Sequence, residues 1–230
     1  MFRVVTYNIR AGVGVDGIMS IRRIGETLAT LSPDIVCLQE VAQHTVGGWL
    51  PNQPKYLGTR LGMESAFQRL RTIGPGGFGN CIVAKSGTLH CRFHRLPGDG
   101  EPRGVLEMLT RIDGQEVVIL NAHLSTDEKE RVSQSEGVRK IAQQISTPKA
   151  LCGDFNDITG SQTIANLLDD IALRDCALEA GKSQLPTFGC SGNKRIDYIF
   201  ADLRFGVKSY DVPITDASDH YPVVVDLDWD

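Results

Sequence analysis

The chain has 230 residues, with 24 Lys and Arg against 28 Asp and Glu, a net charge of −4, 41% hydrophobic residues and 7% aromatic residues. This composition excludes a disordered, collagen-like or coiled-coil protein, because each of these needs a strongly biased sequence. No apolar run reaches the roughly 18 residues that span a bilayer, and the opening residues 1–6 are typical of a strand rather than a signal peptide. We therefore expect a cytoplasmic globular protein with no transmembrane segment, and a monomer.

The first forty residues predict a strand, a helix and a second strand. Residues 2–9 are rich in β-branched and aromatic side chains, which favour a strand. Apolar residues from Ile21 to Leu31 then recur at helical spacing behind Ser20, a residue type that caps helices. Residues 34–40 form an apolar run of the kind found in strands that are covered on both faces.

The middle of the chain is rich in glycine and proline. These residues cluster at 74–79 and 97–100 around a short predicted strand at 80–84, which indicates loops and hairpins. Residues 55–111 also carry nine Lys and Arg against four Asp and Glu, whereas the rest of the chain carries 15 against 24. A basic segment beside an acidic body could steer a phosphorylated substrate, and a solvated surface explains the asymmetry equally well.

The second half repeats the order of the first. Strands are predicted at 117–123 and 150–154, and the helix between them carries Val132, Val138, Ile141 and Ile145. A further helix and three further strands are predicted at 164–171, 195–201, 207–212 and 222–227. No linker separates the halves, so we expect a single domain over the whole chain, residues 1–230.

Four of the predicted strands end in a polar residue: Asn8, Glu40, His123 and Asp154. In sheets built from such strand–helix–strand units, ligands bind outside the carboxyl ends of the strands. Each residue alone has a simple structural explanation, as a turn residue or a hydrogen-bonded buried group. Four at matching positions favour one shared cleft.

Two carboxylates and an imidazole follow late in the chain. Asp197 lies in the apolar strand predicted at 195–201, and Asp219 directly precedes His220. A buried carboxylate is costly unless it is paired, and a histidine held by a carboxylate has a raised pKa and one fixed tautomer. Asp197 could therefore fix His220; the alternative is that Asp197 accepts backbone N–H groups and has only a structural role.

The oxygen ligands among these residues suit a hard divalent cation. Glu40 and Asp219, with Asn8 nearby, offer the carboxylate and amide oxygens that Mg²⁺ prefers. Zinc would need more histidine or thiolate ligands. A magnesium ion that polarises a phosphoryl oxygen, a carboxylate that aligns water and imidazoles that donate protons are the components of phosphoester hydrolysis.

The sequence resembles the endonuclease/exonuclease/phosphatase superfamily, which includes deoxyribonucleases, abasic-site endonucleases, deadenylases, inositol-polyphosphate 5-phosphatases and neutral sphingomyelinases. The resemblance is carried by eight motifs in order: Thr6-Tyr7-Asn8-Ile9-Arg10, Leu38-Gln39-Glu40, Gly79-Asn80, Pro102-Arg103-Gly104, Asn121-Ala122-His123-Leu124, Gly153-Asp154-Phe155-Asn156, Arg195-Ile196-Asp197-Tyr198 and Ser218-Asp219-His220. It implies a four-layer α/β sandwich of two packed mixed β-sheets flanked by helices, like deoxyribonuclease I.

The resemblance also implies a metal site and a phosphate site. Glu40 corresponds to the principal Mg²⁺ ligand, with Asn8 contacting the metal or the phosphate and Asp219 completing the metal side. Mn²⁺ is an alternative ion. On the phosphate side, Arg103 matches a position near the substrate phosphate, although an exposed loop arginine is the alternative, and Asn80 would support a hydrogen bond there.

The acid–base roles follow from the same resemblance. Asp154 would orient or deprotonate the attacking water, and Asn156 and His123 would hold phosphate oxygens. The histidine at 123, where abasic-site enzymes carry tyrosine, argues against abasic-site repair. His220, oriented by Asp197, would stabilise the pentacovalent state or act as the general acid or base.

Two aromatic residues are candidates for the edges of the cleft. Phe188 lies in a loop that often gives the pocket an aromatic wall in relatives, and core packing is the alternative. Trp49 follows Glu40 closely enough to flank the cleft mouth, with the sheet edge as the alternative position.

The substrate class stays open at this point, because loops choose it while the core remains similar. Residues 41–80 and 86–104 are short and contain few aromatic side chains for gripping a duplex. We favour a phosphodiesterase or phosphatase acting on a small molecule, lipid headgroup or other phosphoester. The alternatives are a nuclease acting on DNA or RNA, and a non-catalytic binding module of the same fold.

Overall fold

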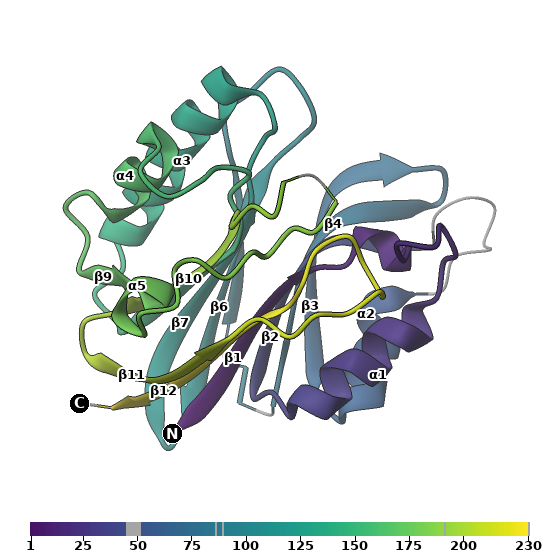
Figure 1. The fold of residues 1–230 in the computed structure, drawn as a ribbon, viewed down its shortest axis with the longest axis horizontal. Coiled ribbons are helices and arrows are strands. Elements are labelled where there is room, and N and C mark those ends of the chain that lie inside the picture. The colour runs from purple at the N-terminus through teal and green to yellow at the C-terminus, as the bar shows by residue number, and fades with distance from the viewer. Residues whose placement is uncertain (45–51, 86, 89, 191, 230) are drawn as a thin grey trace.

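A computed structural model describes residues 1–44, 52–85, 87–88, 90–190 and 192–229 of the chain. Two six-stranded mixed sheets pack face to face, and helices cover their outer faces (Figure 1). The four-layer α/β sandwich predicted from the sequence is therefore confirmed.

In spatial order, the first sheet contains β11 (Phe205–Asp211), β12 (Val223–Trp229), β1 (Phe2–Asn8), β2 (Ile35–Gln43), β4 (Gly76–Ala84) and β3 (Glu64–Ile73). The second contains β5 (His90–Arg95), β6 (Gly104–Ile112), β7 (Gln115–His123), β8 (Lys149–Asp154), β10 (Asp197–Asp202) and β9 (Leu173–Asp175). The helices are η1 (Arg10–Gly12, a 3-10 turn), α1 (Ile21–Leu31), α2 (Gln53–Leu61), α3 (Glu128–Gln143), α4 (Gln162–Leu168) and α5 (Cys176–Glu179). Within the described ranges, no helix is long and apolar enough to cross a membrane.

Each sheet has a parallel pair of strands at its centre. β1 runs parallel to β2, and β7 runs parallel to β8, while the neighbouring strands are antiparallel. The crossover helices are α1 and α3, as the repeated strand–helix–strand order predicted. Because both strands of a parallel pair point the same way, their carboxyl ends meet at one edge of the sheet.

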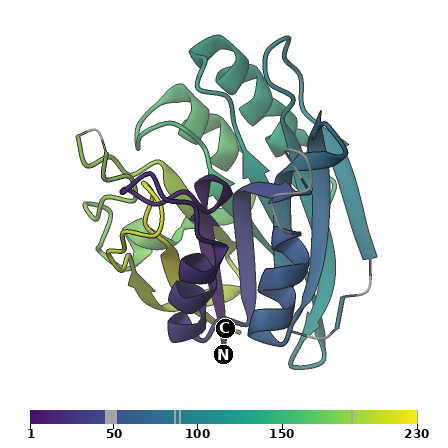
Figure 2. The same ribbon diagram turned by 90° about the vertical axis from the view of Figure 1, so that its right-hand side faces the viewer.

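Helix α1 forms where the sequence placed it, because its apolar side chains share one face. The hydroxyl of Ser20 accepts the N–H of Arg23 at the start, and Ser32 ends the helix in a left-handed conformation. Ile24 and Leu28 are completely buried against the first sheet. α1 and α2 lie side by side over that sheet (Figure 2).

The core has three parts, one at each interface between neighbouring layers. Between the sheets, side chains such as Val4 and Ile119 pack together. Outside the first sheet, α1 and α2 bury Leu28 and Leu57, and outside the second sheet α3 and α4 bury further aliphatic side chains. Each fully buried aliphatic side chain contributes about 1.5–3 kcal/mol relative to an exposed one.

One difference from the prediction concerns the glycine-rich stretch at 74–79. Only Gly74 and Pro75 form the turn, and Gly76 already begins β4. A Cβ atom at Gly76 would lie 2.0 Å from the carbonyl oxygen of Gln43, and one at Gly79 would lie 2.0 Å from that of Gln68. These glycines therefore permit close strand pairing rather than a loop.

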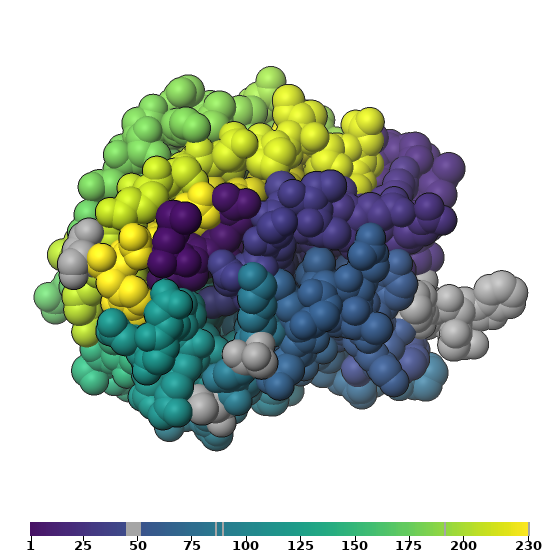
Figure 3. Space-filling model, turned by 90° about the horizontal axis from the view of Figure 1, so that it is seen from below, coloured from purple at the N-terminus to yellow at the C-terminus, as the bar shows by residue number. Residues whose placement is uncertain are grey.

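The chain ends lie away from the carboxyl ends of the central strands. Phe2 is opposite Leu227 in the antiparallel pair of β1 and β12, and the amino group of Met1 lies 3.0 Å from Asp228. Figure 3 shows these first and last strands adjacent on the face seen from below. The carboxyl end of β1 therefore points to the opposite edge, where the polar residues gather.

Candidate active site

Three of the four strand-end residues lie where the sequence placed them. Asn8 ends β1, His123 ends β7 and Asp154 ends β8. His123 and Asp154 are opposite one another in the register of β7 and β8, and all three are buried. The convergence at the carboxyl ends of parallel strands follows from the topology.

Glu40 differs from the prediction, because it lies inside β2 rather than at its end. β2 continues to Gln43, and its register with β4 shifts between Leu38 and Val41, so that β2 carries one extra residue. Glu40 has a left-handed φ of 55° in this β-bulge. Bulges re-aim side chains and are frequent beside active sites. Here Glu40 faces the cavity described below.

Asn8 joins carboxylates that belong to the two sheets. Its Nδ2 donates to Oε1 of Glu40 and to Oδ2 of Asp154, both at 3.0 Å. Its Oδ1 accepts the backbone N–H of Arg10 at 3.1 Å. Asn8 thus orients both carboxylates, and its amide is fixed by a third bond.

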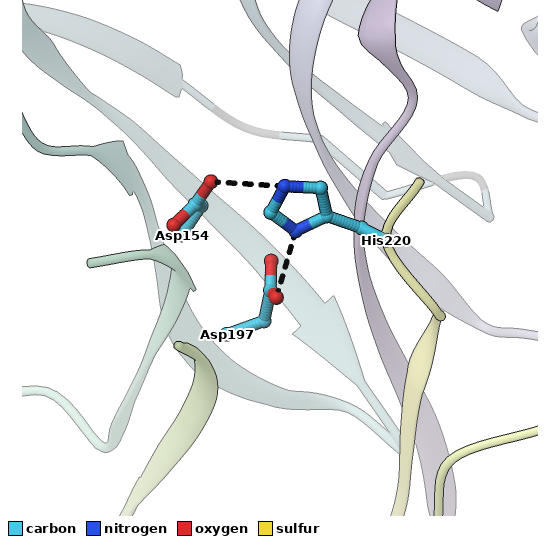
Figure 4. Close-up of side chains that lie close together, drawn as sticks. All are labelled: Asp154, Asp197 and His220. Carbon is cyan, nitrogen blue, oxygen red and sulfur yellow. Dashed lines mark hydrogen bonds and ion pairs between the residues drawn. The ribbon is translucent and has the colours of Figure 1, made fainter. Parts of the chain in front are cut away.

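His220 lies between two buried carboxylates (Figure 4). Its Nδ1 is 2.9 Å from Oδ2 of Asp197, and its Nε2 is 3.7 Å from Oδ2 of Asp154. Burial lowers the pKa of His220, but Asp197, Asp154 and Asp219 outweigh it and raise this pKa to about 10. Burial and the charge of Asp197 raise the pKa of Asp154 to about 7. The cluster therefore combines a cationic imidazole with a carboxylate that titrates near neutrality.

His123 and Asn156 form a second contact beside Asp154. The side-chain nitrogen of Asn156 lies 3.1 Å from Nε2 of His123, which is 3.5 Å from Oδ2 of Asp154. The backbone N–H of Asn156, whose φ is 53°, donates to Oδ1 of Asp154 at 2.9 Å. Burial, with the charges of Arg103 and His220, holds the pKa of His123 well below its usual value. His123 is therefore a neutral imidazole near pH 7.

These residues border a cavity of about 500 Å³ that is lined by Glu40, His123, Asp154, Asn156 and His220. Its remaining walls come from loops, among them Glu101, Arg103, Phe188 and Lys194. The ring centroids of Phe188 and His220 lie 4.8 Å apart.

Arg103 is largely buried and pairs with Glu101 at 3.0 Å, so it is not the exposed loop arginine of the alternative explanation.

Asn80 lies beside the cavity rather than on its wall. It is buried opposite the bulge of β2, and its Nδ2 donates to the carbonyl of Gly104 at 3.1 Å. It borders a small adjoining hollow that also contacts Glu40 and Arg103. Asn80 therefore holds the strand that follows Arg103 against the bulge.

The three residues expected at the metal are not equivalent. Glu40 faces the cavity and Asn8 bonds to it, whereas Asp219 pairs with Arg10 at 3.4 Å. Ser218 links the segment of Asp219 to the carbonyl of Asn8 at 2.8 Å. The carboxylates of Glu40 and Asp154, brought together by one amide, are the kind of oxygen donor that Mg²⁺ requires.

A second group of side chains has its ligand atoms close enough together to hold one metal ion. Ligand atoms of Asp154, Asp197 and His220 lie within 4.8 Å of one another. Both ring nitrogens of His220 face a carboxylate, however, and its pKa of about 10 keeps both of them protonated near pH 7. A protonated nitrogen has no lone pair for a metal, so the fit is better at Glu40.

Several residues around the site were not predictable from the sequence. Thr187 is completely buried, and its hydroxyl accepts the N–H groups of Ile196 and Asp197, both at 3.0 Å. Lys194 and Glu101 are loop residues that directly precede two of the eight motifs but belong to neither. Trp49, considered for the cleft mouth, lies outside the described residues.

Two basic residues of the middle segment lie at the site, and two others are paired with acidic side chains. Arg103 lines the cavity and Arg71 borders the adjoining hollow. Lys85 pairs with Asp34, and Arg111 pairs with Glu116 at 3.1 Å. The charge asymmetry therefore places only part of the positive charge near the site.

The four-layer sandwich of two packed mixed sheets defines a protein of the deoxyribonuclease I-like class. A sequence profile described as Endonuclease/Exonuclease/phosphatase family matches residues 5–220. The chain belongs to the endonuclease/exonuclease/phosphatase family, whose members are typically hydrolases that act on phosphoesters.

Two further proteins are similar to this chain. The uncharacterized protein YbhP of Escherichia coli (strain K12) is 27% identical over 169 residues, which cover 68% of this chain and 67% of YbhP. An endonuclease/exonuclease/phosphatase from Beutenbergia cavernae is 25% identical with a TM-score of 0.85, covering 99% of this chain and 71% of that one.

A more distant structure has the same fold. The mannosyl-6-phosphatase of Bacteroides thetaiotaomicron is 22% identical, with a TM-score of 0.80 and full coverage of both chains. At this identity the likeness concerns the fold alone.

Proposed function

We propose that this protein hydrolyses a phosphoester in the presence of Mg²⁺, with a water molecule attacking phosphorus. The observation that carries this proposal is the position of Asp154. Its carboxylate is hydrogen-bonded to Asn8, which also binds Glu40, and it lies 3.7 Å from His220. A metal-binding acid, a water-orienting carboxylate and a cationic imidazole thus share one cavity.

Glu40 would hold the ion, with Asn8 beside it and Asp219 on the same side. The ion, with Mn²⁺ as the alternative, supplies a Lewis acid that neutralises charge developing on the phosphoryl oxygens. Asn8 fixes the orientation of Glu40 through its 3.0 Å bond. Asp219 pairs with Arg10 at 3.4 Å through one carboxylate oxygen.

Asp154 is the candidate general base. Because burial raises its pKa to about 7, it is partly ionised near neutral pH and is basic enough to accept a proton from water. The water oxygen forms the new bond to phosphorus as the bond to the leaving oxygen breaks. Asp154 takes the proton of the water, and solvent supplies the proton to the leaving group. His220, held cationic beside Asp197, would stabilise the negative charge that builds on the phosphoryl oxygens.

His123, Asn156 and Arg103 would hold the phosphate. His123 is neutral and can donate one ring N–H, and the amide of Asn156 lies beside it. Arg103 is buried at the cavity wall, where its charge favours an anion. Asn80 would act on this side only through the strand that it binds.

The cavity supports a small substrate. Its volume of about 500 Å³ falls within the range of sites for small molecules and cofactors. Phe188 and Lys194 on its wall offer an apolar surface and a positive charge to the group that the phosphate esterifies. A sugar phosphate, nucleotide or lipid headgroup fits this chemistry better than a duplex.

The first experiment is hydrolysis of bis-p-nitrophenyl phosphate and p-nitrophenyl phosphate with Mg²⁺ and with EDTA. We expect Mg²⁺-dependent release of nitrophenol, and a loss of roughly 100- to 10,000-fold in kcat/KM in His220→Ala and Glu40→Gln. His90→Ala and Glu64→Gln, at exposed positions on β5 and β3, are matched controls that should retain activity. Equal turnover in His220→Ala and the wild type would refute the proposal.

A substrate panel then separates the classes of enzyme. It contains single-stranded and duplex DNA, RNA, inositol phosphates, sugar phosphates and sphingomyelin. Preference for a small phosphoester supports the substrate proposed here. Nicking of duplex DNA with a steep salt dependence would instead identify a nuclease, because phosphate contacts along a duplex release counterions.

A further inference from the structure

A buried amide joins the two segments that carry Asn8 and Glu40. Gln53, the first residue of α2, has no exposed surface. Its Oε1 accepts the backbone N–H of Ala42 at 2.8 Å, and its Nε2 donates to the carbonyl of Ala11 at 2.7 Å. Ala11 lies three residues after Asn8, and Ala42 lies two residues after Glu40.

This bridge stands where β1 and β2 diverge. Their parallel register ends with Asn8 opposite Gln39, and one further backbone bond runs from Ile9 to Gln39. After this point β1 turns away into η1, while β2 continues to residue 43. A buried N–H or C=O left without a partner costs about 1–3 kcal/mol. The side chain of Gln53 takes the place of the missing strand, because it pairs with an N–H of β2 and a C=O of η1.

Both bridged segments also contain strained backbone. Arg10 and Ala11 have φ values of 44° and 52°, and Glu40 has φ of 55° in the bulge. Left-handed residues other than glycine cost on the order of 1–3 kcal/mol each and persist only where their surroundings hold them. Gln53 bonds directly to Ala11 and bonds to Ala42 just beyond Glu40. It is therefore placed to hold both conformations.

We propose that Gln53 is a positioning residue that sets the approach of Asn8 to Glu40 and thereby the affinity of the site for a divalent cation. This inference rests on the proposed function, because it takes Glu40 as the ligand of the ion. Asn8 reaches Glu40 through one 3.0 Å bond, so a small displacement of either segment breaks that contact. Removing such a supporting partner lowers metal affinity or activity by roughly 10- to 100-fold.

The test is titration of the full-length protein with Mn²⁺, followed by electron paramagnetic resonance of the free ion. Gln53→Met keeps the volume of the side chain and removes both hydrogen bonds. We expect Mn²⁺ to bind roughly 10- to 100-fold more weakly, with a fall in kcat/KM for the aryl phosphoester. Gln134→Met is the matched control.

Gln134 matches Gln53 in the bonds that it makes. It is almost completely buried on α3, accepts the N–H of Ser125 at 2.8 Å and donates to the carbonyl of Pro97 at 3.0 Å. Gln134→Met therefore loses the same pair of bonds elsewhere in the fold. We expect a similar loss of stability to urea with an unchanged affinity for Mn²⁺.

A second variant serves if Gln53→Met does not fold. Gln53→Glu keeps an acceptor for the N–H of Ala42, but a carboxylate cannot donate to the carbonyl of Ala11. An added negative charge would by itself strengthen cation binding. Weaker Mn²⁺ binding by Gln53→Glu would therefore report a displaced site rather than a changed charge, and would support the proposal.

The outcomes separate this inference from the proposed function. If the wild type binds Mn²⁺ and the folded Gln53 variants bind it equally well, the role of Gln53 is wrong while the proposed function stands. If Gln134→Met weakens Mn²⁺ binding as much as Gln53→Met does, the effect is general destabilisation and the role of Gln53 is again wrong. If the wild type binds no Mn²⁺, the proposed function fails and the role of Gln53 fails with it.

Discussion

At the scale of single residues, the charge of His220 depends on Asp197. Burial lowers the pKa of His220, and Asp197 is the strongest of the opposing influences that together raise it to about 10. Asp197 has no exposed surface, and its Oδ2 lies 2.9 Å from Nδ1 of the imidazole. Because the carboxylate favours the protonated ring, removing its charge must lower the pKa of His220.

Asp197→Asn tests this dependence with little change in shape. We would follow the NMR signals of His220 against pH in protein kept free of metal with EDTA. In Asp197→Asn we expect these signals to report a pKa well below the value of about 10 in the wild type. We expect kcat to fall roughly 100- to 10,000-fold, as for loss of a group that acts in proton transfer or charge stabilisation. His90, exposed on the edge strand β5, is the internal control for effects of the substitution on other histidines. An unshifted His220 titration would contradict the assigned pairing.

The sequence predicted the strand-end residues because each one breaks an apolar run. Asn8, His123 and Asp154 are polar at a position where a buried strand ends, and topology then brings them together. Gln53 gave no such signal, because its two partners are backbone groups of distant segments. Contacts of that kind depend on the tertiary fold and leave no pattern in the local sequence.

At the scale of secondary-structure elements, α3 begins at a cap. The carboxylate of Asp127 accepts the N–H of Glu130 at 3.0 Å, and the first turn carries two further acidic residues that favour the helix N-terminus. Asp127→Ala should lower the free energy of unfolding by about 1 kcal/mol, measured by urea denaturation. Asp127→Asn should keep most of that stability, because asparagine is an equally good cap. Equal losses in both variants would show that charge rather than capping is responsible.

Elements were predictable where the sequence shows a continuous apolar run or apolar residues at helical spacing. β1, α1, β2, β7, α3 and β8 have such patterns, and all six form. α2 contains Pro54 and Gly58, which weaken the helical pattern, and β3 is an edge strand with polar residues on its exposed positions. Such elements form because neighbouring elements stabilise them: α1 packs beside α2, and β4 pairs with β3. Their own sequences are therefore weak predictors.

At the scale of the whole molecule, a polar contact fixes one sheet against the other. Asn121 of β7 accepts the amide N–H of Gln39 of β2 at 2.7 Å. It also donates to the carbonyls of Leu38 and Cys81, both at 2.9 Å. Both amides are completely buried, and Gln39 directly precedes Glu40. Apolar side chains alone would allow the sheets to slide, whereas these directed bonds fix their offset.

A double-mutant cycle measures how strongly this contact couples the sheets. Asn121→Leu should lower the free energy of unfolding in urea by about 1–3 kcal/mol for each buried polar group that it leaves unpaired. Gln39→Leu removes one of those groups, so the double variant should lose less than the sum of the singles, with a coupling of about 0.5–3 kcal/mol. Thr163→Val on α4, where a buried hydroxyl makes no contact with either amide, is the control and should be additive with Asn121→Leu.

Since Asn8 and Asp154 meet across the sheets, both single variants should also lose kcat/KM. A fully additive cycle with undiminished activity would mean that apolar packing by itself aligns the two halves of the site.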